Sequence, residues 1–209
     1  MNKRKKSNKY HIYIILFSLI LNSCTDLQTS NPTSSSEDTS SENSLSVLTW
    51  NVENFPKSGY DTIEYVANII KNSNSDVIAL QEIPNNLNDV GLVALQNLLP
   101  DYSFILGEHS NSDLSVAFFY KKVLEYIDSK EIFTVLDDGY PEYTYPFPRP
   151  PLILQIKWEE DNVYIINNHF KCCSESEDID RRLEASTILK NYIDTTLENQ
   201  KVIILGDLN

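Results

Sequence analysis

The sequence predicts an α/β domain in which a mixed β-sheet carries helices on its outside. Short β-prone runs alternate with helical patterns between residues 45 and 99, and two apolar runs flanking the polar turn 159–162 indicate a hairpin. The chain has 209 residues, of which 41% are hydrophobic and 22% charged. That length and composition suit one sizeable globular core.

The residues before this domain indicate export. Residues 1–9 are basic without any acidic residue, and the apolar run 10–21 is too short for a comfortable membrane span. Leu21-Asn22-Ser23-Cys24 then resembles the cleavage site of a bacterial lipoprotein signal, which makes residues 1–24 the signal peptide. We expect a lipid on the Cys24 thiol and an extracytoplasmic domain anchored to a bacterial membrane. Plain secretion and an uncleaved anchor are the alternatives.

A disordered tether is expected to connect this signal to the domain. Residues 25–44 are rich in Ser and Thr and nearly devoid of large apolar side chains. Such a segment cannot bury enough surface to fold. The folded domain therefore spans residues 45–209.

Hydrophobic periodicity places the elements in the first part of the domain. A first helix is predicted at 61–73, and a second at 89–99 with Val90, Val93, Ala94 and Leu98 on its buried face. Strands are expected at 45–50, 76–81, 102–106 and 115–120.

The second part is predicted to contain a β-rich run at 123–136, a loop rich in proline and tyrosine at 137–151, and the hairpin 152–169. The longest helix is expected at 178–197, where apolar residues recur at helical spacing. The chain closes with Val202-Ile203-Ile204-Leu205, a run typical of a strand buried on both faces. The apolar face of the long helix is predicted to contain Ile179, Leu183, Ser186, Leu189 and Ile193.

The charge balance restricts the binding partners. The formal net charge is −13, and the residues after the predicted signal hold 12 basic against 30 acidic side chains. Such a surface repels polyanions. A substrate that carries phosphate would therefore need a local basic pocket or a bound divalent cation.

Polar side chains gather at the ends of four predicted strands. Asn51, Glu82, His169 and Asp207 each follow an apolar run, and Asn209 follows Asp207 on the same side of an extended chain. Alone, each has a plain structural interpretation: a turn or cap residue for Asn51, a solvated side chain for Glu82, a hydrogen-bonded histidine for His169, and a helix cap for Asp207 and Asn209. If the strands lie side by side, one edge of the sheet collects oxygen ligands of the kind that a hard cation such as Mg²⁺ prefers.

Four motifs in this order resemble the endonuclease/exonuclease/phosphatase superfamily of metal-dependent phosphodiesterases. They are W-N-V-E-N-F at 50–55, Q-E-I at 81–83, N-N-H at 167–169 and G-D-L-N at 206–209. The resemblance covers residues 45–209. It implies a four-layer α/β sandwich of two packed mixed sheets with helices outside.

The resemblance also implies roles for individual residues. Glu82 would be the principal ligand of Mg²⁺, with Mn²⁺ or Ca²⁺ as alternative ions. Asn51 would lie at the metal beside the bound phosphate, and Glu53 matches a second acidic ligand of some members. Arg149 in F-P-R-P-P is similar to an R-x-P element whose arginine contacts substrate phosphate, a contact that the guanidinium fork suits.

Three further residues would carry the hydrolysis. His169 would donate a hydrogen bond to the scissile phosphoryl oxygen. Asp207 would orient the attacking water or protonate the leaving group, and Asn209 would hold the geometry. A cation and aimed donors are what a developing negative charge on phosphoryl oxygens requires.

The sequence departs from the family pattern at its end. Members close with a further strand and an Asp-His pair, whereas this sequence ends at Asn209. The resemblance therefore implies a domain incomplete at its C-terminus, with little or no hydrolytic activity. The adjacent Cys172 and Cys173 are expected to be free thiols, or to pair with a cysteine outside this sequence, and to have a structural role.

The leading functional prediction is a monomeric, extracytoplasmic, Mg²⁺-dependent phosphodiesterase that acts on nucleic acid. A lipid or inositol phosphate hydrolase is the second interpretation, favoured by the predicted membrane tether. A surface lipoprotein that keeps the fold only for binding is the third, favoured by the absent Asp-His pair.

Overall fold

A computed structural model describes residues 44–85, 90–110, 112–134, 136–138 and 142–209. All of them belong to the second of two compact units, residues 43–209. The predicted signal peptide, Cys24 and the tether up to residue 43 lie outside the described residues. In the described part of the chain, no helix has the length and apolar character needed to cross a membrane.

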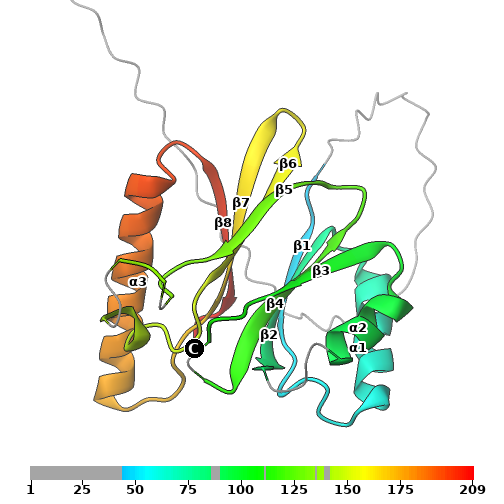
Figure 1. Ribbon diagram of the computed structural model, residues 1–209, viewed down its shortest axis with the longest axis horizontal. Coiled ribbons are helices and arrows are strands. Elements are labelled where there is room, and N and C mark those ends of the chain that lie inside the picture. Colours follow the sequence, from blue (N-terminus) through cyan, green and yellow to red (C-terminus); the bar gives the residue numbers. More distant parts are fainter. Residues whose placement is uncertain (1–43, 86–89, 111, 135, 139–141) are drawn as a thin grey trace, which may run out of the picture. The chain divides into compact units, whose positions relative to one another are not determined.

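The described residues of the domain form two four-stranded sheets (Figure 1). Sheet A has the order β1 (Val47–Asn51), β2 (Val77–Pro84), β4 (Leu114–Lys121) and β3 (Tyr102–Leu106), and only β1 and β2 run parallel. Sheet B has the order β5 (Glu125–Glu131), β6 (Leu152–Trp158), β7 (Asp161–His169) and β8 (Lys201–Asp207), and only β7 and β8 run parallel. Both sheets are therefore mixed, as the sequence predicts.

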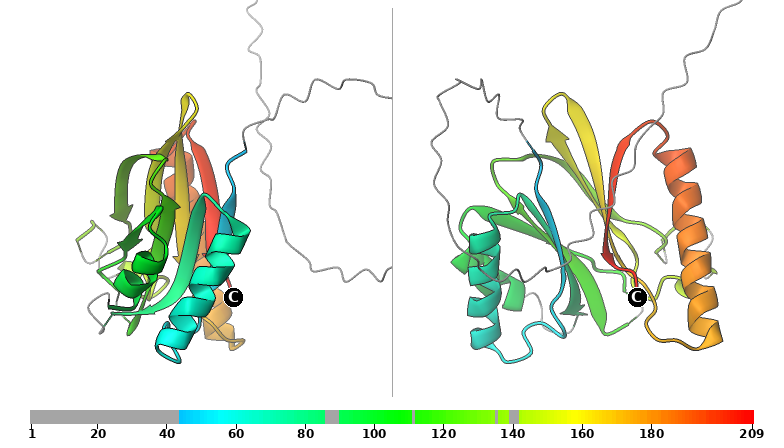
Figure 2. Two further views of the ribbon diagram at one scale, coloured as in Figure 1. Left: turned by 90° about the vertical axis from the view of Figure 1, so that its right-hand side faces the viewer. Right: turned by 180° about the vertical axis from the view of Figure 1, so that it is seen from behind.

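Helices cover the outer faces of the two sheets (Figure 2). Helices α1 (Tyr60–Ser73) and α2 (Val90–Leu98) pack on sheet A, and α3 (Ser176–Thr196) packs on sheet B. A short 3-10 turn, η2 (Glu142–Thr144), lies in the loop before β6. Three apolar clusters fill the spaces between these layers. The predicted four-layer α/β sandwich is confirmed.

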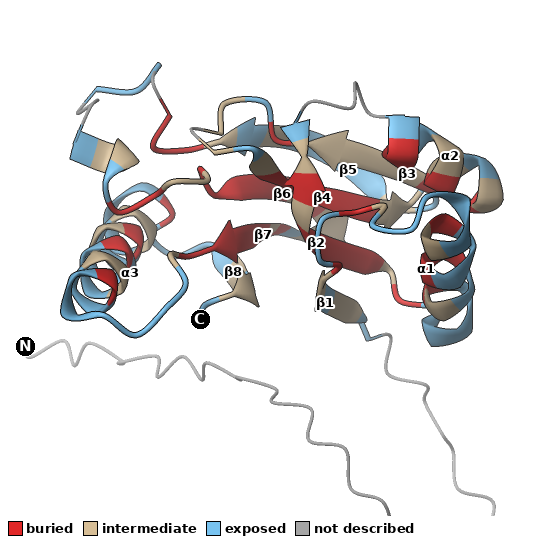
Figure 3. Ribbon diagram, turned by 90° about the horizontal axis from the view of Figure 1, so that it is seen from below, coloured by how far each residue is buried: buried red, intermediate tan, exposed pale blue. Residues whose placement is uncertain are grey.

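The central cluster joins the two sheets face to face. Its members come from β2 and β4 on one side and from β6 and β7 on the other, and Figure 3 shows these strands as the buried centre of the domain. Ala79, Phe118, Leu154 and Ile165 are fully buried there. Because side chains alternate along a strand, every second residue of these strands points into this layer.

The buried face of α2 differs from the prediction. Leu92 and Leu95 are buried, whereas Val90 is 67% exposed and Val93 46% exposed. The reason is Gly91, which faces Pro56: a methyl group at Gly91 would lie 3.1 Å from the Pro56 ring. The helix turns its small residue toward this loop, and the two valines rotate into solvent.

The predicted face of α3 is also only partly correct. Ala185 and Leu189 are buried, but Ile179 is 50% and Leu183 66% exposed. The apolar cluster on sheet B takes its helical members from position 185 onward. The first turns of α3 therefore contribute no apolar contact to this core.

The expectation that the last strand is buried on both faces is wrong. Ile203 and Leu205 pack against the central cluster and Val202 against the outer one, but Ile204 is 48% exposed. Within the described residues, β8 is one of the two edge strands of sheet B and pairs only with β7, and Ile204 is left partly open to solvent.

Candidate active site

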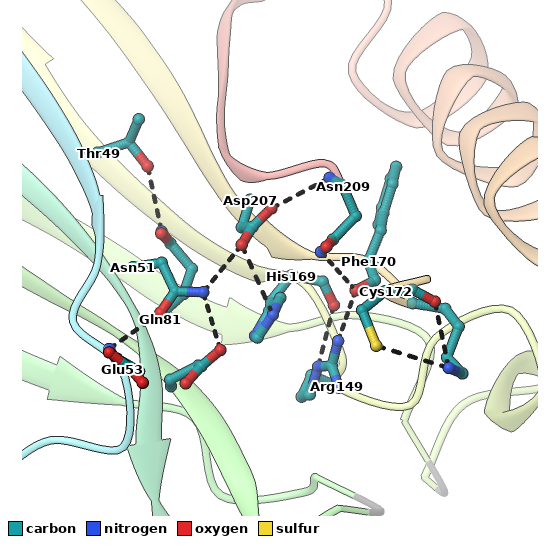
Figure 4. Close-up of polar contacts among 12 residues, drawn as sticks. Thr49, Asn51, Glu53, Gln81, Arg149, His169, Phe170, Cys172, Asp207 and Asn209 are labelled. Carbon is teal, nitrogen blue, oxygen red and sulfur yellow. Dashed lines mark hydrogen bonds and ion pairs between the residues drawn. The ribbon is translucent and has the colours of Figure 1, made fainter. Parts of the chain in front are cut away.

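The candidate site lies where the ends of four strands meet (Figure 4). The sequence placed these ends along one sheet edge. The structure instead divides them between facing edges: β1 and β2 belong to sheet A, and β7 and β8 to sheet B. Contacts between β1 and β8 bring the two edges together.

Asn51 connects the two sheets at this point. Its side-chain nitrogen Nδ2 donates to Glu82 Oε1 at 2.9 Å and to Asp207 Oδ2 at 2.8 Å. Its oxygen Oδ1 accepts the backbone N–H of Glu53 at 3.0 Å. One amide nitrogen is therefore hydrogen-bonded to two carboxylates from different sheets. Its two hydrogen bonds keep these carboxylate oxygens close to each other.

Glu82 is aimed by a β-bulge. The register between β2 and β4 shifts at this residue, and its φ of 65° lies in the left-handed region. A non-glycine residue in that conformation costs on the order of 1 kcal/mol and is typical of functional sites. The bulge leaves Glu82 Oε1 on Asn51 and lets Oε2 accept the Asn54 backbone N–H at 3.1 Å.

His169 faces Asp207 across the parallel β7–β8 pair. The two residues are in register, and Nε2 of His169 lies 3.9 Å from Asp207 Oδ2. Burial, together with the positive charge of Arg149, lowers the pKa of His169 to about 4, although the Asp207 and Glu82 carboxylates oppose this shift. The imidazole is therefore neutral at pH 7, and its Nδ1 has no hydrogen-bond partner among the described residues.

Asp207 and Asn209 form a turn at the end of β8. Asp207 Oδ1 accepts the Asn209 backbone N–H at 3.1 Å, and Asn209 Nδ2 donates to the carbonyl oxygen of Phe170 at 3.2 Å. Gly206 just before them has a φ of 128°, and a methyl group there would lie 2.0 Å from the Asn168 carbonyl oxygen. Only glycine permits this approach of β8 to β7.

Arg149 lies behind His169 and contacts the backbone. Its Nε donates to the His169 carbonyl oxygen at 3.1 Å and its Nη2 to the Phe170 carbonyl oxygen at 2.5 Å. Burial lowers the pKa of the guanidinium, while the thiol of Cys172 and the carboxylates of the site act in the opposite direction. The structure thus brings Arg149 to the site, where it braces the segment after β7. Contact with substrate phosphate stays a prediction.

The backbone of Glu53 contacts Asn51, but its side chain pairs with a residue outside the site. Its side chain is 68% exposed and forms an ion pair with Lys57, four residues further along the chain. Glu53 and Asn54 both have positive φ, so the backbone changes direction two residues after Asn51. The carboxylate of the proposed second acidic ligand is therefore paired with Lys57 in this structure.

Two buried polar residues of the site were not assigned a role from the sequence. Gln81 Nε2 donates to Thr49 Oγ1 at 3.1 Å (Figure 4) and to Asn167 Oδ1 at 2.8 Å. Asn167 Nδ2 donates to the carbonyl oxygens of Leu80 and Ala117 at 3.0 and 2.9 Å. The amides link sheet B to sheet A one residue before Glu82 and two before His169. The signal was present in the sequence as polar residues at inward positions of apolar strands.

The donor set suits a hard cation with few protein ligands. In the described part of the chain, no group of three or more His, Cys, Asp or Glu side chains could hold a metal ion. Mg²⁺ is ordinarily bound through one or two carboxylates and keeps several waters. Glu82, with Asn51 beside it and Asp207 across the Asn51 amide, fits that pattern.

The fold and these side chains define the class of protein: two packed mixed sheets with carboxylates, an amide and a buried imidazole at their facing edges. Residues 48–209 match the model of the Endonuclease/Exonuclease/phosphatase family. The chain therefore belongs to this family, whose description covers enzymes that cleave phosphoester bonds.

Several solved structures share the fold. TDP2 from D. rerio, complexed with a single-strand DNA product, is 21% identical with a TM-score of 0.61, over 79% of this chain and 60% of that chain. A Bacteroides thetaiotaomicron mannosyl-6-phosphatase is 17% identical with a TM-score of 0.56, over 79% and 66%. ANGEL2, a 2',3'-cyclic phosphatase, is 15% identical with a TM-score of 0.58, over 79% and 52%. The chain thus spans between half and two-thirds of these proteins, and no curated protein sequence matches it.

Proposed function

We propose that this chain belongs to an enzyme that hydrolyses phosphodiester bonds with the assistance of a divalent cation, Mg²⁺ in the first instance and Mn²⁺ or Ca²⁺ as alternatives, and that the 209-residue chain itself has little activity. The observation that carries the proposal is the Asn51 amide, which holds the Glu82 and Asp207 carboxylates together across two sheets beside a neutral His169. Glu82 and Asn51 would hold the cation, which would neutralise charge that develops on the phosphoryl oxygens.

The protein groups have complementary tasks in this reaction. The neutral His169 can donate one N–H hydrogen bond to a phosphoryl oxygen while its imidazole carries no net charge. The Asp207 carboxylate can accept a hydrogen bond from a water and orient it, since Asn209 and Asn51 fix its two oxygens. Arg149 keeps the His169 backbone in place and adds positive charge behind the site.

Nucleic acid is the substrate class that we propose. One neighbour of the same fold is complexed with a single-strand DNA product, and Arg149, which resembles the phosphate-contacting arginine of an R-x-P element, donates to the backbone at His169. With a formal charge of −13, the chain would need the cation to approach a polyanion. Other neighbours are named as phosphatases, so a phosphomonoester substrate is the outcome that would replace this part of the proposal.

The location is a further part of the proposal. The signal pattern ending at Cys24 supports a lipid-anchored, extracytoplasmic, monomeric enzyme. Expression in a bacterium with a radiolabelled fatty acid tests it: label on the wild-type chain and none on Cys24→Ala is expected. Label on both chains, or on neither, would contradict lipidation.

Metal binding is the first test of the activity, because it does not depend on the substrate. Mg²⁺ at one hundred times its dissociation constant should stabilise the full chain by about 2.7 kcal/mol in thermal unfolding. Glu82→Gln should lose this stabilisation, whereas the matched control Glu64→Gln, exposed on α1, should keep it. Equal stabilisation of both variants would place the cation elsewhere.

Hydrolysis is the second test. Single-stranded DNA, bis(p-nitrophenyl) phosphate and p-nitrophenyl phosphate are offered to the full chain with Mg²⁺ or with chelator. We expect weak cleavage of the two diesters at most, and Glu82→Gln and His169→Ala should abolish whatever cleavage is measured. Faster turnover of the monoester would identify a phosphatase, and turnover that survives chelation would overturn metal assistance.

A further inference from the structure

The backbone segment after β7 is held through its carbonyl groups. Residues 169–173 follow one another, and each of their five carbonyl oxygens accepts a side-chain hydrogen bond. Those of 169 and 170 accept from Arg149, those of 171 and 173 from Arg182, and that of 172 from Lys171. Three cationic side chains therefore fix the stretch from the candidate catalytic histidine to a pair of cysteines.

The two cysteines at the end of this segment lie together at the surface. Cys172 and Cys173 are both exposed, and their sulfur atoms are 2.7 Å apart. The Lys171 ammonium lies 3.7 Å from the Cys172 sulfur. Cys173 has a φ of 87°, a conformation that non-glycine residues rarely adopt. Two accessible thiols in contact beside a cation are suited to thiol chemistry.

We propose that Cys172 and Cys173 form a dithiol site that reacts with small-molecule disulfides and closes into a disulfide between the two adjacent residues. The Cys172 thiolate attacks one sulfur of the reagent, so a mixed disulfide forms and one thiolate leaves. The Cys173 thiolate then attacks the Cys172 sulfur, so the second thiolate leaves. The two protein thiols are oxidised, the reagent is reduced, and the two thiol protons pass to solvent or to the leaving thiolates.

The surroundings distinguish the two sulfur atoms. A hydrogen bond from Cys173, supported by the nearby Lys171 ammonium, lowers the pKa of Cys172. The same hydrogen bond raises the pKa of Cys173. Cys172 is therefore the attacking thiolate and Cys173 the resolving thiol, because the thiolate is the nucleophilic form.

Adjacency makes the closed form easy to reverse. Neighbouring Cα atoms are about 3.8 Å apart across a trans peptide, whereas disulfide-linked Cα atoms are usually about 4.4 to 6.8 Å apart. The ring that contains the Cys172–Cys173 peptide must therefore be strained, and strained, exposed disulfides are the reducible ones. The site is thus suited to reversible modification and unsuited to permanent stabilisation.

Closure of this ring would alter backbone hydrogen bonds that connect to the candidate active site. The ring would turn the 172 and 173 carbonyls, which accept from Lys171 and Arg182. Arg182 also holds the 171 carbonyl, next to the Phe170 carbonyl that accepts from Arg149 and Asn209. Because His169 begins the same segment, oxidation should loosen its position. The coupling between oxidation of the cysteines and the position of His169 rests on the proposed function only where hydrolytic activity is measured.

Mass spectrometry tests the dithiol site without any assay of hydrolysis. The full chain with Cys24→Ser is treated with oxidised glutathione, alkylated and digested with trypsin, which releases residues 172–181 as one peptide. We expect this peptide to lack two hydrogens and to resist alkylation until a reductant is added. Cys173→Ser should instead retain one glutathione on Cys172, and Cys172→Ser should react more slowly. Alkylation of both cysteines after oxidation, or two glutathiones on one peptide, would overturn the proposal.

Hydrogen exchange then tests the coupling to His169. The Phe170 N–H donates to the Asp207 carbonyl oxygen at 2.9 Å, and its exchange should be faster in the oxidised chain than in the reduced one. If bis(p-nitrophenyl) phosphate is a substrate, oxidation should lower kcat/KM by about tenfold or more, since small displacements of catalytic groups are costly. Unchanged exchange at Phe170 would refute the coupling and leave a dithiol with no influence on the site.

Discussion

Replacing Asn167 with leucine removes the amide that ties sheet B to sheet A beside the candidate site. Asn167 is fully buried and makes three hydrogen bonds: to Gln81, to the Leu80 carbonyl and to the Ala117 carbonyl. A typical buried hydrogen bond contributes about 1 kcal/mol net, so Asn167→Leu should destabilise the domain by about 3 kcal/mol. Leucine has a similar volume, which keeps the cavity contribution small.

Urea unfolding of the full chain measures this loss as a lower midpoint at an unchanged m value. The matched test is the double-mutant cycle with Gln81→Leu, which also leaves a buried partner unpaired. In each single variant one buried amide faces an apolar side chain, whereas the double variant has neither amide. The free energy of unfolding lost in the double variant should therefore be smaller than the sum of the two single losses by about 1 to 2 kcal/mol. A loss for Asn167→Leu below about 0.5 kcal/mol, or strict additivity of the two changes, would refute the structural role that we assign to this pair.

Three further predictions follow from the site. Gly206→Ala should cost about 3 kcal/mol or more in urea unfolding, since its methyl group would lie 2.0 Å from the Asn168 carbonyl oxygen, and a wild-type midpoint would contradict that. The pKa of His169 is about 4 in the folded chain against 6.5 ordinarily, so the unfolded chain protonates first as pH falls. Stability from this residue is complete above pH 6.5 and declines by roughly 2 kcal/mol toward pH 4, a slope that His169→Asn should lack. Asn51→Leu should weaken Mg²⁺ binding by about 10- to 100-fold in calorimetry, because its amide orders both carboxylates; an unchanged affinity would remove Asn51 from the site.

Much of the fold was accessible from the sequence because its strands are strongly patterned. The apolar runs of β2, β6 and β7 have no alternative to burial, and the turn 159–160 between β6 and β7 is polar. The helix faces were less accessible. Helical periodicity predicts Val90 and Val93 in the core, but both are exposed. The helix instead places Gly91 against Pro56, where a side chain would be too close to the proline ring.

The candidate site was accessible as a set of residues but not as an arrangement. Polar residues directly after apolar runs indicated Asn51, Glu82 and Asp207, and the structure places them together. The sequence does not reveal that Glu82 sits in a bulge with positive φ, because the register shift depends on the partner strand. It also does not show that Arg149 binds backbone carbonyl oxygens. Every residue has a carbonyl, so the residue letters do not indicate which one the arginine contacts.

The division of the site between two sheets has a consequence for how the chain acquires it. The hydrogen bond from Asn51 to Asp207 joins residues separated by 156 positions, so almost the whole domain forms the loop that it closes. Contacts of such separation repay their loop-closure entropy only after the intervening elements have formed. The hydrogen bond between the Asn51 amide and Asp207 is therefore expected to form late in folding. A single proteolytic cut in the loops between β4 and β7 would separate Asn51 and Glu82 from His169 and Asp207 along the chain.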